Sequence, residues 1–197
     1  MKKDVRKHNK KIFKENGFEG SIFSSNSCGD FIVFGKNHRK NNHNFYDIAF
    51  IDTSEVYVER DDRILNGDIK DYMHKTIYST ACLGRDYLKI RKNDKQLCKS
   101  LLKRYRSMIA RCYNKQDHNY EFCGKIGTYV SNRWLNFSNY YYDIISLPNF
   151  DREAILNNDL VIDKDIKQFG CDKKVYSKDT VTLVSEKVNL VNRVYKN

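Results

Sequence analysis

Leu160-Val161-Ile162-Asp163 opens the part of the chain that decides the fold. Three apolar residues closed by an aspartate are typical of a short strand, and residues 180–184 form a second candidate strand after a polar loop at 164–174. Ser185 suits the N-cap of a short helix over 185–193, with Glu186 near its positive end. This order predicts a ββα unit, which buries too little surface to be stable unless it packs on the helices that precede it.

The clearest helix is predicted at residues 95–112. One face is apolar at helical spacing, with Leu97, Leu101, Tyr105, Met108 and Cys112 at its centre and Cys98, Leu102 and Ile109 beside them. Four basic residues share another face within about 80° of one another, namely Lys95, Lys99, Lys103 and Arg106. Such a face either follows a phosphate backbone or is an ordinary solvated surface.

A second helix is predicted at residues 131–146, before Pro148. Its apolar positions are Trp134, Leu135, Phe137, Tyr141, Ile144 and Ile145. The aromatic side chains offer stacking platforms for bases. At this spacing, however, we expect them to form part of the core.

The N-terminal half changes to short alternating runs between turn residues, which favours an antiparallel sheet. Strands are expected at 21–23, 31–34, 46–51 and 55–58, with a loop at 35–44 rich in Asn and Gly. The predicted fold class is therefore α+β. Its parts are a basic N-terminal arm at 1–16, a small antiparallel β domain at 17–90, and a domain of helices plus the ββα unit at 91–197.

The charge is concentrated in two places. The chain has 36 Lys and Arg against 25 Asp and Glu, a net charge of +11. Residues 1–12 carry a net +5 and residues 85–111 a net +8, so the rest of the chain is close to neutral. Two basic segments on a neutral body indicate a polyanionic partner, with nucleic acid first and an anionic membrane surface second.

Other patterns exclude several classes of protein. The six cysteines and five histidines form no pair at zinc-ligand spacing, so we expect reduced, mostly buried thiols in a cytosol. The basic start leads into no apolar segment, which argues against a secretory signal, and no apolar run is long enough to span a membrane. No small-molecule cofactor is indicated.

Three further segments carry a resemblance to a known family. They are Tyr105-Arg106-Ser107-Met108-Ile109-Ala110-Arg111-Cys112-Tyr113-Asn114, Trp134-Leu135-Asn136-Phe137 and the run from Leu160 through Val175-Tyr176-Ser177-Lys178-Asp179-Thr180 to Asn189. In order and spacing they resemble phage-encoded HNH endonucleases of the homing type. The resemblance extends over about residues 17–192, and it places the protein in the cytoplasm of an infected bacterial host or in the virion.

The resemblance implies a site for Mg²⁺ or another divalent ion. Asp163 and Asn189 match the metal-binding positions, and Lys164 stands where the family has its catalytic His. The loop that should carry an orienting Asn offers Asp172 instead. A lysine amine, with an ordinary pKa of about 10.4, is a poor general base at neutral pH, so the match implies slow cleavage or none.

Three functions follow from these observations. The first is a protein that binds DNA on an HNH-type scaffold with impaired cleavage, and the second is an active Mg²⁺-dependent endonuclease. The third is a virion or host-interaction protein with an acidic protein partner. The residues expected to contact nucleic acid are Lys95, Lys99, Lys103, Arg106 and Arg111, and His118 is either a surface residue or a distant contributor to the groove.

Overall fold

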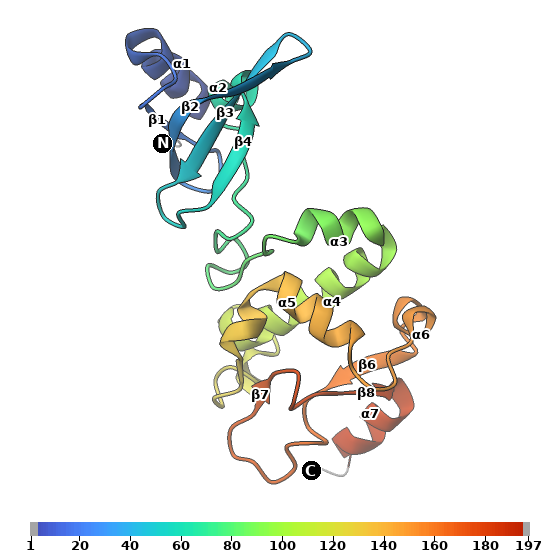
Figure 1. The fold of residues 1–197 in the computed structure, drawn as a ribbon. Coiled ribbons are helices and arrows are strands. Elements are labelled where there is room, and N and C mark those ends of the chain that lie inside the picture. Colours follow the sequence, from blue (N-terminus) through green and yellow to red (C-terminus); the bar gives the residue numbers. More distant parts are fainter. Residues whose placement is uncertain (1–3, 195–197) are drawn as a thin grey trace. The chain divides into compact units, whose positions relative to one another are not determined.

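The computed structural model describes residues 4–194. The chain divides into two units, Met1–His74 and Lys75–Asn197. Both helices and strands occur in each unit, so the fold is a mixed α+β fold with a small antiparallel sheet, as predicted (Figure 1). The division falls earlier than the predicted boundary at 90/91. Ile77, Ala81 and Ile90 explain the difference, because all three are buried in the core of the second unit.

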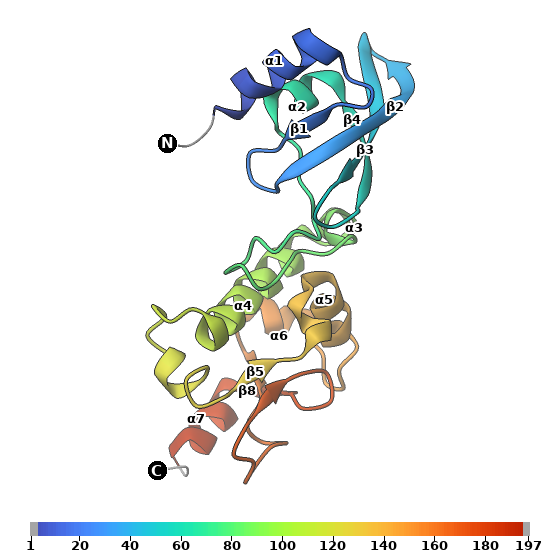
Figure 2. The same cartoon turned by 90° about the vertical axis from the view of Figure 1, so that its left-hand side faces the viewer.

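The first unit is a four-stranded antiparallel sheet covered by two helices. Its strands are β1 (Ile22–Ser24), β2 (Asp30–Lys40), β3 (His43–Phe50) and β4 (Val56–Arg60), paired in that order, and its helices are α1 (Val5–Asn16) and α2 (Asp61–Asn66). Both helices lie on one face of the sheet (Figures 1 and 2). Phe31, Val33, Ile48 and Phe50 fill the core there, whereas Val58 is exposed.

The loop predicted at 35–44 is instead a long hairpin. Strand β2 continues to Lys40 and β3 begins at His43, so the connection has two residues, Asn41 and Asn42. Both have positive φ, 49° and 62°. Asparagine tolerates this conformation better than most residues, and a two-residue turn of this kind matches the twist of paired strands. The Asn-rich composition therefore marks a tight turn.

The N-terminal segment is not a separate arm. Asp4 caps helix α1 by accepting a bond from Lys7 N at 3.1 Å. Asn9 is completely buried: its Nδ2 donates to Ser24 O at 2.8 Å and to Ile64 O at 2.9 Å, and its Oδ1 accepts from Ser24 N at 3.0 Å. One amide thus attaches the helix to both β1 and α2.

The second unit is built around α4 (Lys95–Tyr113), the helix predicted at 95–112. Asp94 caps it by accepting a bond from Leu97 N at 3.0 Å. The other elements are α3 (Tyr87–Asn93), η1 (Tyr120–Phe122), β5 (Tyr129–Val130), η2 (Asn132–Leu135), α5 (Phe137–Ile145), α6 (Arg152–Asn157), β6 (Leu160–Asp163), β7 (Val175–Tyr176), β8 (Thr182–Ser185) and α7 (Glu186–Val194). The predicted apolar stripe of α4 is buried in the core.

The second predicted helix is divided at Asn136. Residues 132–135 form a short 3₁₀ turn, and α5 starts after Asn136, whose side chain accepts from Ser138 N at 2.9 Å. Trp134 and Phe137 are completely buried. The expectation that these aromatic residues form part of the core is confirmed.

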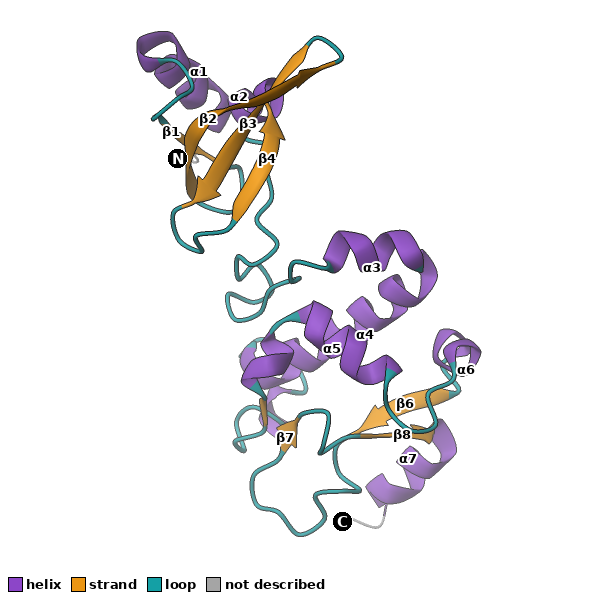
Figure 3. Ribbon diagram, in the orientation of Figure 1, coloured by secondary structure: helices purple, strands orange, loops and turns teal. Residues whose placement is uncertain are grey.

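The C-terminal segment has the predicted order of strand, loop, strand and helix. Strands β6 and β8 pair antiparallel, with Leu160 opposite Ser185 and Asp163 opposite Thr182. Helix α7 follows β8 directly (Figure 3). Val188 N donates to Ser185 Oγ at 3.4 Å. The sequence did not indicate β7, which pairs parallel with β5. No helix in the described part of the chain is long and apolar enough to cross a membrane.

Candidate functional site

The basic face of α4 is the first component of the candidate site. Lys95, Lys99, Lys103 and Arg106 are all exposed. Within residues 4–194, none of these four side chains forms an ion pair, whereas Arg152, which follows on α6, is bonded to Asp94 at 2.6 Å. The opposite face of α4 is fixed in the core. The charge is therefore held on a rigid element and is not neutralised by nearby carboxylates.

A cavity of about 300 Å³ lies beside this face. Elements α4, α5, β6, β7 and α7 all contribute to its wall, which is formed by Ser100, Lys103, Arg104, Ser107, Met108, Arg111, Tyr140, Asn158, Val161, Ile162, Tyr176 and Asn189. Three of these residues are cationic and none is acidic. The cavity is consequently a positively charged concave surface, and such a surface concentrates the field on an anion.

A second hollow adjoins the cavity, since Ser100, Lys103 and Asn158 line both. Lys99 and Arg106 also line this hollow, on the side of α4 that faces α6. Its one carboxylate is Glu153, which pairs with Arg152 at 2.5 Å. The predicted contact residues Lys99, Lys103 and Arg106 therefore line one concave surface, and Arg111 joins it through the cavity.

Arg104 fixes the geometry of the cavity wall. Its guanidinium donates to Leu160 O at 2.8 Å, to Ile155 O at 2.7 Å and to Asn158 Oδ1 at 3.0 Å. Burial lowers the pKa of Arg104 from its usual value. These bonds hold α4 against the start of β6 and keep a cationic group at the cavity.

Arg111 is held more loosely. Its Nε donates to Ser107 O at 3.2 Å, and its Nη1 lies 3.5 Å from the hydroxyl of Tyr176. No carboxylate pairs with it in the described ranges. The side chain therefore keeps donor capacity for an anion in the cavity.

Only one of the two predicted metal-binding residues, Asn189, lines the cavity. Asp163 is 4% exposed, and its Oδ1 accepts from Asp165 N at 2.7 Å and from Ile166 N at 2.8 Å, so it closes the turn after β6. Asn189 is half-buried on α7 and lines the cavity, whereas Asp163 is not part of the cavity wall. In this structure Asp163 has a structural role.

Neither predicted catalytic residue, Lys164 nor Asp172, lines the cavity. Lys164 Nζ donates to Asp165 Oδ1 at 2.9 Å and lies 5.9 Å from the centre of the Tyr176 ring. Lys174 pairs with the same carboxylate. Asp172 is exposed on the loop between β6 and β7. His118 lies between α4 and η1, and its side chain is 88% exposed. Lys164 is thus engaged with the carboxylate of Asp165.

The donor set implied for Mg²⁺ fits that ion poorly. A divalent cation prefers several oxygen ligands, and Asp163 already uses one oxygen for two backbone N–H groups. The ammonium groups of Lys164 and Lys174 lie at the adjacent Asp165 and would repel a cation. We therefore derive no catalytic step through a metal at this place.

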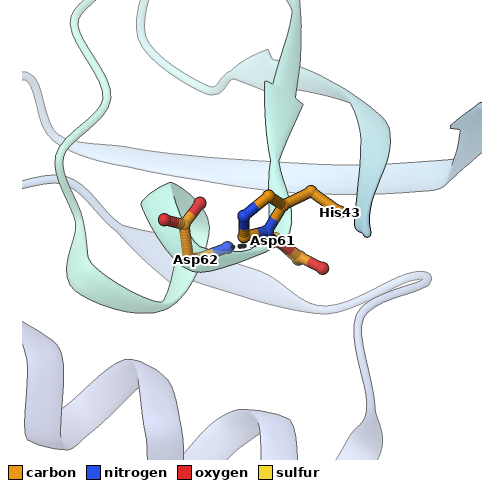
Figure 4. A group of neighbouring side chains, drawn as sticks. All are labelled: His43, Asp61 and Asp62. Atoms are coloured by element: carbon orange, nitrogen blue, oxygen red, sulfur yellow. Dashed lines mark hydrogen bonds and ion pairs between the residues drawn. The ribbon is translucent and has the colours of Figure 1, made fainter. Parts of the chain in front are cut away.

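The first unit contains a separate cluster, His43, Asp61 and Asp62, whose potential ligand atoms lie within 4.8 Å of one another. His43 Nδ1 is 2.9 Å from Asp61 Oδ1 (Figure 4), and Arg60 donates to Asp62 from Nη2 at 2.7 Å. Burial raises the pKa of Asp61, but bonds from Asn44 N and His43 outweigh it, and the net pKa is lowered. The carboxylates are thus satisfied by protein groups.

The outer face of α1 is the second basic surface. Lys7, Lys10, Lys11 and Lys14 line a shallow hollow on this one helix. Lys11 pairs with Glu15 at 3.8 Å. This surface is part of a single exposed helix, in contrast to the hollows around α4.

Sequence reasoning missed Arg104 and Tyr140, which help to form the cavity wall. The signal for Tyr140 is present, because it lies three residues after Phe137 on the apolar side of α5. No local pattern indicates Arg104, since its partners are 51 to 56 residues away in the chain.

All six cysteines are free, and five are buried.

Comparison with known proteins adds no relative. No family model matches the chain, and neither a curated protein nor a solved structure is similar to it at a significant level.

Proposed function

We propose that this protein binds nucleic acid, with DNA as the first candidate, through the basic face of α4 and the adjoining cavity. The observation that carries the proposal is that Lys99, Lys103 and Arg106 form no ion pair within residues 4–194 and line a concave surface. The one carboxylate in the lining of that surface, Glu153, is already paired with Arg152. Phosphate groups are the ligands such a surface favours, because each Lys or Arg contact releases condensed counterions.

The scaffold behind this surface supports the same proposal. A hairpin followed directly by a helix packs near α4, in the order that the resemblance to HNH endonucleases implies. We propose that the chain uses such a scaffold for binding and cleaves poorly. The support for poor cleavage is that Asp163 closes a turn and Lys164 is paired with Asp165.

A DNA shift assay at increasing salt tests the binding. We expect a duplex to bind at low salt without strong sequence preference and to dissociate as salt rises. The Lys99→Ala, Lys103→Ala, Arg106→Ala triple variant should bind more weakly. If wild type and triple variant bind equally, the contact surface lies elsewhere. If neither binds, an acidic protein partner becomes the better explanation of the charge.

A plasmid digestion assay with Mg²⁺ or Mn²⁺ tests the cleavage. We expect no nicking above the buffer control. Efficient nicking that is lost on Asn189→Ala would instead show the alternative function, a metal-dependent endonuclease.

A further inference from the structure

The wall of the cavity contains a polar group that the fold does not use. Tyr140 on α5 is completely buried, and its hydroxyl has no hydrogen-bond partner. Leaving such a group unpaired in the interior costs about 1–3 kcal/mol. Phenylalanine would fill the same volume without that cost, so the structure of the second unit gives no reason for the hydroxyl.

The surroundings of this hydroxyl are cationic. Arg104 and Arg111 both act electrostatically on Tyr140, and both line the cavity with it. Burial raises the pKa of Tyr140 more strongly than the two guanidinium groups lower it. The hydroxyl is therefore protonated at neutral pH and available as a donor.

Two further cationic side chains have capacity for a ligand. Lys103 is exposed and forms no ion pair within residues 4–194, and Arg111 is held only by bonds of 3.2 to 3.5 Å to neutral groups. Arg104, in contrast, is fixed on carbonyl oxygens through its two Nη atoms, and its buried Nε has no partner in the described part of the chain. A buried donor, a loosely held guanidinium and an ammonium therefore share one wall.

We propose that this cavity binds a phosphate group carried on a small organic residue, such as a phosphorylated sugar. Arg111 and Lys103 contact the phosphate oxygens, and the Tyr140 hydroxyl donates to one of them. A volume of about 300 Å³ is at the lower end for ligand pockets, which favours a mononucleotide-sized group over a large cofactor. The ligand is either the phosphorylated end of a strand, in which case the inference rests on the proposed nucleic-acid function, or a free nucleoside monophosphate.

Isothermal titration calorimetry with inorganic phosphate and with a nucleoside 5′-monophosphate tests the cavity directly. Sodium chloride at matched ionic strength is the control for general charge effects. We expect saturable binding, with the monophosphate tighter than phosphate. The sole tryptophan, Trp134, is a second probe, because its ring centre is 5.0 Å from that of Tyr140.

Two tyrosine variants form a matched pair. Tyr105→Phe removes another completely buried hydroxyl without a partner, but Tyr105 does not line the cavity. Tyr140→Phe should weaken phosphate binding by about tenfold, which corresponds to one bond to a charged group, and Tyr105→Phe should leave it unchanged. Equal binding by both variants, or no saturable binding by the wild type, overturns the proposal.

Oligonucleotides with a 5′-phosphate or a 5′-hydroxyl separate the two sources of ligand. Preference for the 5′-phosphate that disappears in Tyr140→Phe identifies a strand end as the ligand. Monophosphate binding that depends on Tyr140, with no binding of either oligonucleotide, supports the cavity and contradicts the nucleic-acid function. Equal binding of both oligonucleotides by wild type and Tyr140→Phe, with no monophosphate bound, supports the nucleic-acid function and contradicts the cavity.

Discussion

Helices α1 and α4 carry the two basic segments of the sequence, yet each is held in its unit in a different way. Asn9 is the one buried residue of α1, and its amide forms the bonds that attach the helix to the first unit. Eight residues of α4 are buried, and its cations line two hollows formed with neighbouring elements. Two basic helices thus gave two different surfaces, a shallow hollow on a single helix at α1 and a concave site formed with neighbouring elements at α4. A more enclosed surface focuses an electrostatic field on a ligand more strongly.

The largest change in stability is expected when the attachment of α1 to the first unit is removed. Asn9→Ala removes three buried hydrogen bonds, two of them to backbone groups of Ser24 and one to Ile64 O, so we expect a loss of about 3 kcal/mol in the stability of the first unit. Urea unfolding followed by far-UV circular dichroism measures it. The exposed Lys10→Ala on the same helix is the control and should change stability by less than about 0.5 kcal/mol.

Trp134 fluorescence adds a second readout to this experiment, because the side chain lies in the core of the second unit. The unfolding midpoint measured by Trp134 fluorescence should be the same in Asn9→Ala and wild type. A shift equal to that seen by circular dichroism would contradict the separation into two cores.

The next largest change in stability is expected at Asp143, in the second unit. Burial raises its pKa, but bonds from Arg133 and from Trp134 Nε1 at 2.8 Å outweigh it and hold the pKa below the ordinary value. The resulting stabilisation is complete above the ordinary Asp pKa of about 3.9 and is lost as pH falls toward the lower folded value. Asp143→Asn should cost about 2 kcal/mol at pH 7, because it weakens bonds to a buried acceptor.

The pH dependence distinguishes this account from a simple packing defect. Stability measured by Trp134 fluorescence between pH 2.5 and 7 should fall less steeply on acidification in Asp143→Asn than in wild type. Some slope should remain, since the Arg152 bond also lowers the pKa of Asp94. Parallel curves for the two proteins would exclude the proposed role of the Asp143 carboxylate.

The smallest expected effect concerns the hairpin turn of the first unit. Asn42 has φ of 62°, a conformation that glycine adopts without steric cost. We expect Asn42→Gly to stabilise the hairpin by about 0.5 kcal/mol and Asn42→Ala to destabilise it by about 1 kcal/mol. Chemical unfolding of the two variants measures the difference. The reverse order would show that the turn conformation is not as described.

The elements with regular apolar spacing were predictable from the sequence. The stripe of α4 and its cap Asp94 lie together in the chain, so helix and core face follow from local pattern. Strand β6 and helix α7 could also be predicted from the sequence. For the helix, Ser185 signals the start. The turn at Asn41 and Asn42 was misread as a loop, since composition alone does not reveal a φ value.

The candidate site was only partly predictable. The cations of α4 were visible as a charged face, but their concave setting depends on residues far along the chain. Arg104 reaches Leu160, and Tyr140 meets the cavity from α5. The two backbone bonds that Asp163 accepts could not be predicted either, because they depend on the turn that follows it. Spacing in the sequence does not determine such long-range geometry.

The salt dependence of DNA binding is the most direct test of the contrast between the two helices. Two triple alanine variants remove equal charge, one at Lys99, Lys103 and Arg106 on α4 and one at Lys7, Lys10 and Lys14 on α1. We expect the slope of log K against log salt to fall by about one unit per lost phosphate contact, close to three units, for the α4 variant and by clearly less for the α1 variant. Equal slopes for both variants, or a larger change for α1, would contradict the account.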